Sequence, residues 1–513
     1  MYPIIPVHET ENWQYQDIIK DTIAGISLER AQELVADKEN TTVTVAIIDT
    51  PIEISHEHLK NNIWINTSEI PNNNIDDDKN GYIDDIHGWN FMGNANGVND
   101  IYIQMESTRL LKKYETQRQK NIKESTYILA KKLYDSMYKK SKKEYDHYSK
   151  IYEVYYDIKR EMSKKSLNDD YSIKQLDSIK DVYADDWLFK SAVTSLINLE
   201  KYISRNDIIF FNELYTKHLE VLFNKDYNDR EIKGDNPNDL NDSNYGNNII
   251  NHNLDKLKHG TFVSAPMVQS SKSQVQGISS KIKIMPVCIS GYGSEHDKDI
   301  ALAIRYAVDN GAKVINISLG KLLSLRKEWV FEAFKYAEQH DVIIVSSAGD
   351  HSLNLTEVNY YYPNDNEDNG TEVSNNFLLV GASTYDPNEK LVAPFSNYGN
   401  IDVDIFAPGI EIFTTTVHNT YDFEDGTAMA TSITSGVAAL IFSYYPNLTA
   451  WEVKQIIMKS GVSYDIMVNK PSTNRDKELV PFSSLSKSGK VVNAYNALLL
   501  AEEVSKKKKK PKK

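Results

Sequence analysis

This chain of 513 residues has one cysteine, fewer basic than acidic residues and no very long apolar run. The single cysteine, Cys288, has no partner with which to form an internal disulfide. Acidic residues outnumber basic ones by 72 to 58, and the net charge of -14 argues against nucleic-acid binding, which depends on basic patches. No apolar run reaches the roughly 18 residues of a membrane-spanning helix. We therefore expect no nucleic-acid partner and no transmembrane segment.

Glycine and proline are missing from one long stretch. The chain has 22 Gly and 15 Pro, yet none of them lies between residues 98 and 233. A segment without these turn-forming and helix-breaking residues is typically helical, and Leu129, Leu133 and Met137 recur in it at the four-residue step of a helix face. We interpret 98–233 as an inserted helical subdomain. It is either a simple helical hairpin or a surface that contacts a partner or selects a protein substrate.

Outside this stretch, strand-like and helix-like segments alternate. The apolar runs at 44–48, 313–318, 342–345 and 377–380 suit buried parallel strands, and 300–310 has the pattern of a helix. Alternation of this kind predicts an α/β fold, with a doubly wound, mostly parallel sheet between two layers of helices.

These features divide the chain into four parts. Residues 1–43 form an N-terminal arm, and 44–97 together with 234–500 form one discontinuous core domain around the insertion. The end of the chain, 501–513, closes with seven lysines and one proline. We expect this lysine-rich tail to be disordered.

Three short motifs place polar residues at the ends of strands or the starts of helices. Asp49 follows the first apolar strand, and His259 precedes Gly260 at the start of a helix. The third motif, 425–431, reads Asp-Gly-Thr-Ala-Met-Ala-Thr and leads into an apolar helix. In this order the motifs resemble those of the subtilisin-like serine protease (subtilase, peptidase S8) superfamily. With matching segments such as 316–320, 347–350 and 406–409, the resemblance extends over 44–60, 250–270 and 280–500.

The resemblance implies a subtilisin-like fold and the hydrolysis of peptide bonds through an acyl-enzyme. His259 would be the base that activates a serine, and Asp49 would orient the imidazole and stabilise its positive charge. The substrate would be a protein or peptide in an extended conformation, bound by strand addition. The residues that the resemblance places along its backbone are Ser318, Leu319, Gly320, Gly291 and Gly293.

Two residues depart from the family pattern. The nucleophilic serine corresponds to Ala428, which has no nucleophile, and the oxyanion-hole asparagine corresponds to Asp350, whose ionised carboxylate would repel the oxyanion. As written, the chain should therefore not hydrolyse peptides. An engineered serine-to-alanine change would leave the rest of the site intact, as Asp49 and His259 are here. The alternative is a natural pseudoprotease that binds peptides or a partner, and Asp350 favours it.

An acidic loop at 76–85 has the spacing of a calcium-binding loop. Oxygen-bearing side chains stand at positions 1, 3 and 5, Gly at 6 and an apolar residue at 8, although His87 replaces the usual glutamate at 12. Hard oxygen ligands suit a structural Ca²⁺, and a turn held by Asx hydrogen bonds without an ion is the simpler alternative. The candidate ligands are Asp76, Asp78, Asn80, Tyr82 through its carbonyl, Asp84 and Asp85.

The first residues do not resemble a signal peptide, because 1–7 lack a basic start and a long apolar core. Two locations therefore stay open. The protein is extracytoplasmic, either secreted or in the cell envelope, if a leader was removed, and cytoplasmic otherwise. The calcium-type loop favours the first location, because calcium is scarce in the cytosol.

Overall fold

The computed structural model describes residues 11–117, 123–165, 167, 171–270, 273–358, 360–367, 370–472 and 478–509. The chain divides into two compact units. Met1–Ile101 and Arg230–Lys513 form the first, which we name the core unit, and Tyr102–Asp229 forms the second, which we name the helical unit. The helical unit lies within the segment that the sequence analysis interprets as an insertion.

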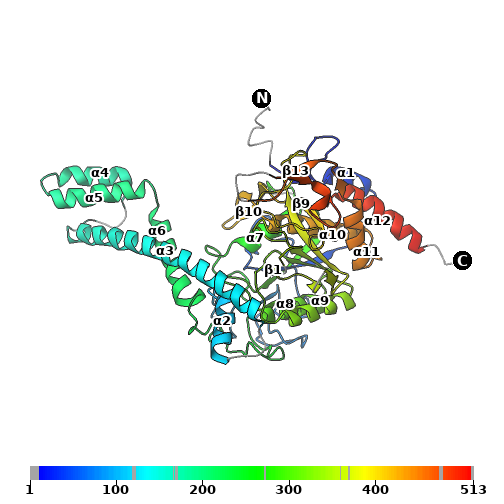
Figure 1. Ribbon diagram of the computed structural model, residues 1–513, viewed down its shortest axis with the longest axis horizontal. Helices are drawn as coiled ribbons and strands as arrows, with labels where there is room; N and C mark the ends of the chain where they lie inside the picture. The colour runs from blue at the N-terminus through cyan, green and yellow to red at the C-terminus, as the bar shows by residue number, and fades with distance from the viewer. Residues whose placement is uncertain are drawn as a thin grey trace. The chain divides into compact units, whose positions relative to one another are not determined.

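A nine-stranded sheet forms the centre of the core unit (Figure 1). The strand order is β12-β15-β9-β8-β5-β4-β1-β3-β2, and within this sheet, among the described residues, only β12 and β15 pair in antiparallel fashion. The predicted α/β fold with a mostly parallel sheet is confirmed. The strands of this sheet are β1 (Val43–Asp49), β2 (Trp89–Asn90), β3 (Ile282–Cys288), β4 (Val314–Ile317), β5 (Ile343–Ser347), β8 (Phe377–Ser383), β9 (Ile405–Pro408), β12 (Val462–Ser463) and β15 (Lys490–Val491).

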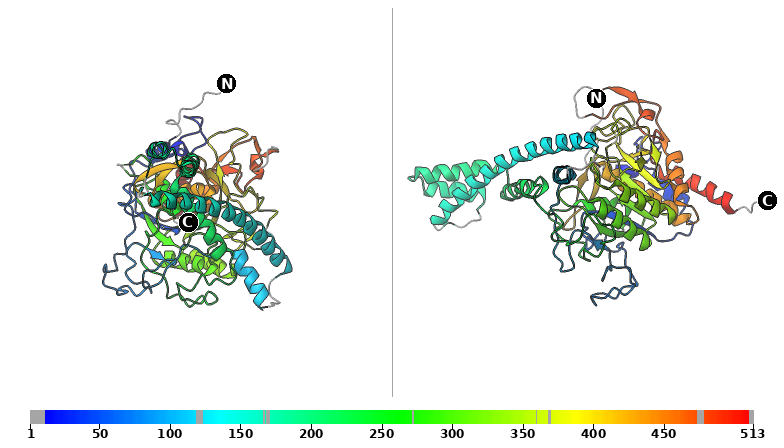
Figure 2. Two further views of the ribbon diagram at one scale, coloured as in Figure 1. Left: turned by 90° about the vertical axis from the view of Figure 1, so that its left-hand side faces the viewer. Right: turned by 60° about the horizontal axis from the view of Figure 1, so that its bottom comes forward.

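Helices cover both faces of the sheet. Successive side chains of β1 point to opposite faces, so this strand contributes to a separate hydrophobic cluster on each face. Val45 and Ile47 belong to one hydrophobic cluster, whereas Ala46 and Ile48 belong to another. The helices of the first cluster are α1 (Leu28–Leu34), α7 (His259–Ser264), α10 (Thr427–Tyr444), α11 (Ala450–Ser460) and α12 (Ala494–Lys509). The helices of the second cluster are α8 (Asp297–Asp309) and α9 (Lys327–Gln339). The sheet is thus the middle of three layers (Figure 2).

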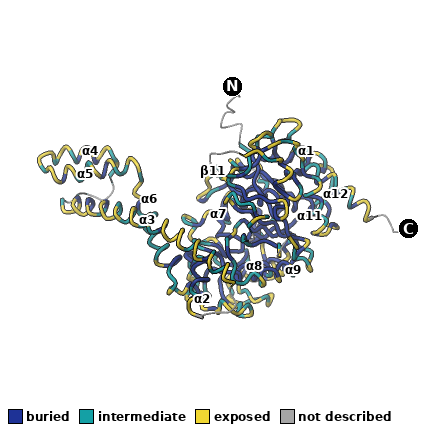
Figure 3. The backbone as a smooth tube through the Cα atoms, in the orientation of Figure 1, coloured by how far each residue is buried: buried dark blue, intermediate teal, exposed yellow. Residues whose placement is uncertain are grey.

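Helix α10 is buried along nearly its whole length. By length and composition alone it could cross a membrane, but 94% of this stretch is buried inside the fold. Its buried side chains belong to the first hydrophobic cluster, so α10 is a core helix of the three-layer fold. Figure 3 shows that the centre of the core unit is buried, whereas much of its surface is exposed.

Short elements complete the core unit. Three hairpins lie outside the main sheet among the described residues. They are β6 (Asn366–Glu367) with β7 (Thr371–Glu372), β10 (Ile412–Thr416) with β11 (Thr420–Glu424), and β13 (Met467–Asn469) with β14 (Leu479–Pro481). Single 3-10 turns are η2 (Trp13–Tyr15), η4 (Ala265–Met267) and η5 (Phe482–Ser484).

The helical unit has a hydrophobic core of its own. Tyr155, Met162, Leu176, Phe189 and Val193 are buried together, and α4 and α5 lie side by side (Figure 2). The elements of this unit are α2 (Glu106–Gln117), α3 (Glu124–Lys164), α4 (Ile173–Val182), α5 (Trp187–Glu200), α6 (Arg205–Lys217) and the π-helical turn η3 (His218–Leu222).

The prediction of a disordered tail from residue 501 is wrong as far as Lys509, where α12 ends; residues 510–513 lie outside the described residues. Lysine is a good helix former, and positive charge is favourable near the C-terminus of a helix. Ion pairs add to this, since the Lys506 ammonium lies 2.7 Å from Glu502 and the Lys508 ammonium lies 2.6 Å from Glu452.

A buried ionic cluster holds the segment where the chain re-enters the core unit. Asp299 in α8 accepts hydrogen bonds from Arg230 and Lys233, each at 2.8 Å, and Arg230 also pairs with Asp235 at 2.6 Å. Lys298 lies 2.5 Å from the same Asp235. These side chains are at most 3% exposed, so each charge is stabilised by its ionic partners instead of by hydration.

The cluster predicts that Asp299→Asn lowers the free energy of unfolding by about 3–5 kcal/mol, because the change leaves buried cations without their anion. Chemical denaturation at neutral pH measures this loss. Asp309→Asn, on the exposed end of α8, is the matched control and should change stability by less than about 1 kcal/mol. Similar losses for the two variants would contradict the prediction.

Candidate active site

The candidate site lies where several parallel strands end at one edge of the sheet. Asp49 is the last residue of β1 and stands in register with Cys288, the last residue of β3. On its other side β1 pairs with β4, and β4 pairs with β5. Because parallel strands share one carboxyl edge, the segments after β1, β4 and β5 emerge together, which is where ligands bind in sheets of this kind.

A carboxylate–imidazole pair stands at this edge. The Nδ1 atom of His259, the first residue of α7, lies 2.8 Å from Oδ1 of Asp49. The Thr50 N–H donates to the same oxygen at 2.7 Å. The Asp49 side chain is 1% exposed and that of His259 is 42% exposed. The carboxylate is thus enclosed, while the imidazole is partly exposed.

Close packing of α7 on the end of β1 sets the direction of the imidazole. The Gly260 N–H donates to the Thr50 hydroxyl at 2.8 Å. A Cβ atom at Gly260 would lie 2.4 Å from the Thr50 carbonyl oxygen, so only glycine allows this approach. The Gly after the histidine is therefore what brings α7 close enough for the pair to form.

Negative charge surrounds the imidazole. Loss of hydration opposes its protonation, but the charge and hydrogen bond of Asp49, and then the charges of Glu424 and Asp350, raise the pKa of His259 above its ordinary value. Glu424 ends β11, and the sequence analysis did not single it out. No motif marks this residue, and only the β10–β11 hairpin brings it near His259.

Helix α10, which carries Ala428, packs against α7, which carries His259. Ala428 lies in the first turn of α10 and is 8% exposed. One turn further along, the Ser432 hydroxyl donates to the Val263 carbonyl at 2.6 Å, and Val263 is one turn after His259 in α7. This bond joins the second turn of α10 to α7 close to the starts of both helices. The methyl group of Ala428 is the only side-chain atom that this position offers to the imidazole.

Asp350 holds the N-terminus of α10. Its Oδ1 accepts the Thr427 N–H at 2.9 Å, and the Gly349 N–H donates to the Thr427 hydroxyl at 3.0 Å. A carboxylate is favourable at a helix N-terminus, where unpaired N–H groups leave partial positive charge. A second negative charge, such as the oxyanion of acyl transfer, would meet repulsion at the same place.

The residues expected along the substrate are distributed over two segments. Ser318, directly after β4, donates from its hydroxyl to the Ala428 carbonyl at 3.0 Å, so the 318–320 segment adjoins the candidate site. Gly291 and Gly293 follow β3, and the Tyr292 N–H between them donates to the Ile101 carbonyl at 2.7 Å. The structure thus joins the first segment to α10 and pairs the second with the last residue before the helical unit.

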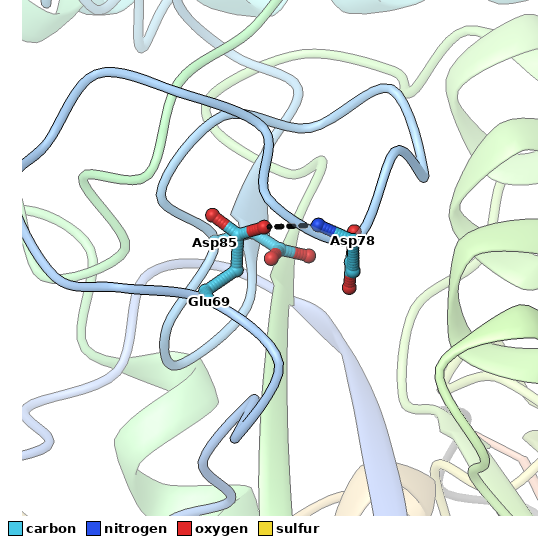
Figure 4. A group of neighbouring side chains, drawn as sticks. All are labelled: Glu69, Asp78 and Asp85. Carbon is cyan, nitrogen blue, oxygen red and sulfur yellow. Dashed lines mark hydrogen bonds between the residues drawn. The ribbon is translucent and has the colours of Figure 1, made fainter.

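The acidic loop gathers only some of its predicted ligands. Asp78 and Asp85 offer oxygens that lie within 4.8 Å of each other and of one from Glu69, which the sequence analysis missed (Figure 4). Asp76 accepts backbone N–H groups of its own loop, and Asp84 accepts those of Asn73 and Asn74. Asn80 and Tyr82 also belong to the loop. Asn80 donates to Asp78 at 3.3 Å and to Asp85 at 3.2 Å, and the Tyr82 ring packs on Trp89.

The environment of the imidazole predicts that Asp49→Asn lowers the pKa of His259, because the strongest favourable charge is removed. Glu424→Gln should lower this pKa less, since Glu424 contributes charge without a hydrogen bond to the ring. A histidine NMR titration of the three chains measures both effects, with the exposed His340 as internal control. An unchanged pKa of His259 in Asp49→Asn would contradict the assigned pairing.

Comparison with known proteins identifies a family for this chain. A model of the subtilase family matches residues 40–484. A thermophilic serine proteinase of Bacillus sp. (strain AK1) is 33% identical over 211 residues, which cover 40% of this chain and 48% of that protein. The cell wall-associated protease of Bacillus subtilis (strain 168) is 30% identical over 223 residues, which cover 42% of this chain and 23% of that protein. The match thus spans less than half the length of either relative.

Two further proteins complete the comparison. Subtilisin DY of Bacillus licheniformis is 28% identical over 214 residues, which cover 41% of this chain and 73% of that protein. A mutant of the protease domain of PatA has a TM-score of 0.38 and 25% identity, and the match covers 48% of this chain and 81% of that domain. The family match includes Asp49, His259, Asp350 and Ala428 in one span, and the chain belongs to the subtilase family of subtilisin-like serine proteases.

Proposed function

We propose that the chain has the architecture of a serine endopeptidase whose nucleophile position is occupied by Ala428, so that it is inactive as it stands. The observation that carries the proposal is the Asp49–His259 pair at the carboxyl edge of the sheet, beside the first turn of α10. A serine at position 428 would carry its hydroxyl where Ala428 has only a methyl group. An engineered serine-to-alanine change accounts for an otherwise complete site.

The proposed mechanism is acyl transfer to a serine at position 428. Because Nδ1 of His259 donates to Asp49, the other ring nitrogen would take the proton of the serine hydroxyl as it attacks the carbonyl carbon. The Asp49 carboxylate would stabilise the imidazolium, and the imidazolium would then protonate the leaving amine. In the second half of the reaction, His259 would take a proton from water as the water attacks the acyl carbonyl, and the imidazolium would return a proton to the serine oxygen.

Asp350 is the part of the site that fits this reaction least. An ionised carboxylate does not donate a hydrogen bond to the oxyanion, whereas an asparagine amide would. This residue supports the alternative proposal, a natural pseudoprotease that holds an extended peptide or a partner along 318–320. In that case the role of Asp350 would be to cap α10 by accepting the Thr427 N–H, with no reaction to serve.

Ala428→Ser should produce peptidase activity that His259→Ala abolishes in the same background. Loss of one oxyanion donor costs about 10²–10³ in kcat in such sites, so Asp350→Asn added to Ala428→Ser should raise kcat by roughly tenfold or more. Cleavage of a denatured protein substrate and labelling by a serine-directed fluorophosphonate provide the two measurements. Absence of both in Ala428→Ser, with Asp350 retained, would refute the protease proposal and leave the binding protein.

We further propose that Glu69, Asp78 and Asp85 hold a structural Ca²⁺. Oxygens that lie within 4.8 Å of one another can reach one ion at the about 2.4 Å of a calcium–oxygen bond. Glu69 also accepts the N–H groups of Asp77 at 2.8 Å and Asp78 at 3.1 Å, which positions the carboxylate beside the loop. The ion would offset the repulsion among three neighbouring carboxylates and so stabilise the loop.

Calcium should raise the melting temperature of the unmodified chain relative to chelated protein at matched ionic strength. Asp78→Asn should reduce this response strongly. The matched control is Asp77→Asn, because the Asp77 carboxylate accepts from Ile70 and Asn73 instead of facing the cluster. Differential scanning calorimetry with calcium, magnesium and chelator compares the three chains. A melting temperature that does not respond to calcium would exclude a structural ion here.

The location and the partners follow from these proposals. We place the protein outside the cytoplasm, supported by the carboxylate cluster suited to Ca²⁺ and by similarity to a cell wall-associated protease. A partner contact through the helical unit stays a prediction. Its exposed apolar side chains Val182, Trp187 and Leu188, near the turn between α4 and α5, offer a surface for such a contact.

A further inference from the structure

We propose that Tyr361 closes the space beside the reactive carbonyl of the substrate. The substrate residue that supplies this carbonyl would then have to be glycine or alanine. This inference rests on the proposed function, since it names the class of peptide that the same site accepts. It is carried by the position of one buried tyrosine ring between two glycines.

The ring of Tyr361 fits flush against two glycine backbones. A Cβ atom at Gly320 would lie 2.1 Å from the Tyr361 hydroxyl oxygen, and a Cβ atom at Gly349 would lie 2.5 Å from the same ring. Neither distance is possible for a real side chain, so both positions need glycine if the ring is to stay where it is. The Tyr361 side chain is 4% exposed. The space between the two segments is therefore filled.

A short antiparallel bridge holds the tyrosine in this place. The Tyr362 N–H donates to the Lys321 carbonyl at 2.8 Å, and the Lys321 N–H donates to the Tyr362 carbonyl at 2.7 Å. Lys321 is itself buried and lies 2.8 Å from Asp297 at the start of α8. The bridge fixes the backbone next to Tyr361, and the ring itself is held by burial against Gly320 and Gly349.

The filled space adjoins the position of the reacting atoms. Ser318, two residues before Gly320, bonds to the Ala428 carbonyl, and the Gly349 N–H bonds to Thr427 in the same helix turn. The two segments that enclose Tyr361 therefore both border the start of α10. If a peptide places its reactive carbonyl over Ala428 and its backbone along 318–320, as the proposed function requires, its adjacent side chain would point between these segments. A hydrogen or methyl group fits above the ring, whereas an aromatic side chain would collide with it.

The inference is tested with two peptides that differ only in the residue before the cleaved bond, alanine in one and phenylalanine in the other. Ala428→Ser should cleave the alanine peptide with a kcat/KM about 10²-fold higher. Tyr361→Ala in this background should lower the ratio tenfold or more, chiefly by faster cleavage of the phenylalanine peptide. Tyr361→Phe keeps the ring and should keep the ratio. A preference of Ala428→Ser for the phenylalanine peptide would overturn the inference.

Binding separates failure of this inference from failure of the proposed function. If Ala428→Ser cleaves neither peptide and does not react with the fluorophosphonate, the protease proposal fails. The unmodified chain should nevertheless bind the alanine peptide more tightly than the phenylalanine peptide in calorimetric titrations. Equal binding, or tighter binding of the phenylalanine peptide, would refute the role of Tyr361. If Tyr361→Ala does not fold, the binding of the two peptides by the unmodified chain still decides between these outcomes.

Discussion

The parallel pairing of β1 with β3 and β4 is the constraint on which the site depends. Parallel strands end at a common edge, so Asp49 at the end of β1 and Ser318 just after β4 come to the same place although 269 positions separate them along the chain. Both faces of β1 are buried, and a shift of one residue in register would turn the side chains of each face to the other. The hydrophobic core therefore fixes the location of the carboxylate that orients His259.

Two helix N-termini use this edge in different ways. The start of α7 places a basic imidazole against Asp49, and the start of α10 places its N–H groups against Asp350. In a working protease the second N-terminus would supply the oxyanion with donors. Here the Asp350 carboxylate occupies part of that positive region, and Ala428 keeps a backbone N–H but has no nucleophilic hydroxyl. The Asp350 carboxylate thus stabilises the start of α10 but would oppose an oxyanion at the same place.

Sequence patterns predicted the sheet well, because buried parallel strands are short apolar runs and α8 has a clear helical period. The segment 300–310 lies almost wholly within α8, and the run at 44–48 lies within β1. The prediction of disorder for the lysine-rich end is wrong as far as Lys509. The Lys506–Glu502 pair is local to α12, at a spacing of four residues, whereas the Lys508–Glu452 pair depends on how α12 packs. Charge alone could not reveal the second pair.

The sequence by itself determined the order of the motifs, the candidate base and its carboxylate, and the absence of a nucleophile at position 428. These features are local, because each depends on residue identity within a few positions. Only the tertiary structure brought Glu424 near His259, Glu69 near Asp78, and Tyr361 between Gly320 and Gly349. The physical reason is that charge and steric exclusion act over distances of a few ångströms in space, and separation along the chain says nothing about those distances.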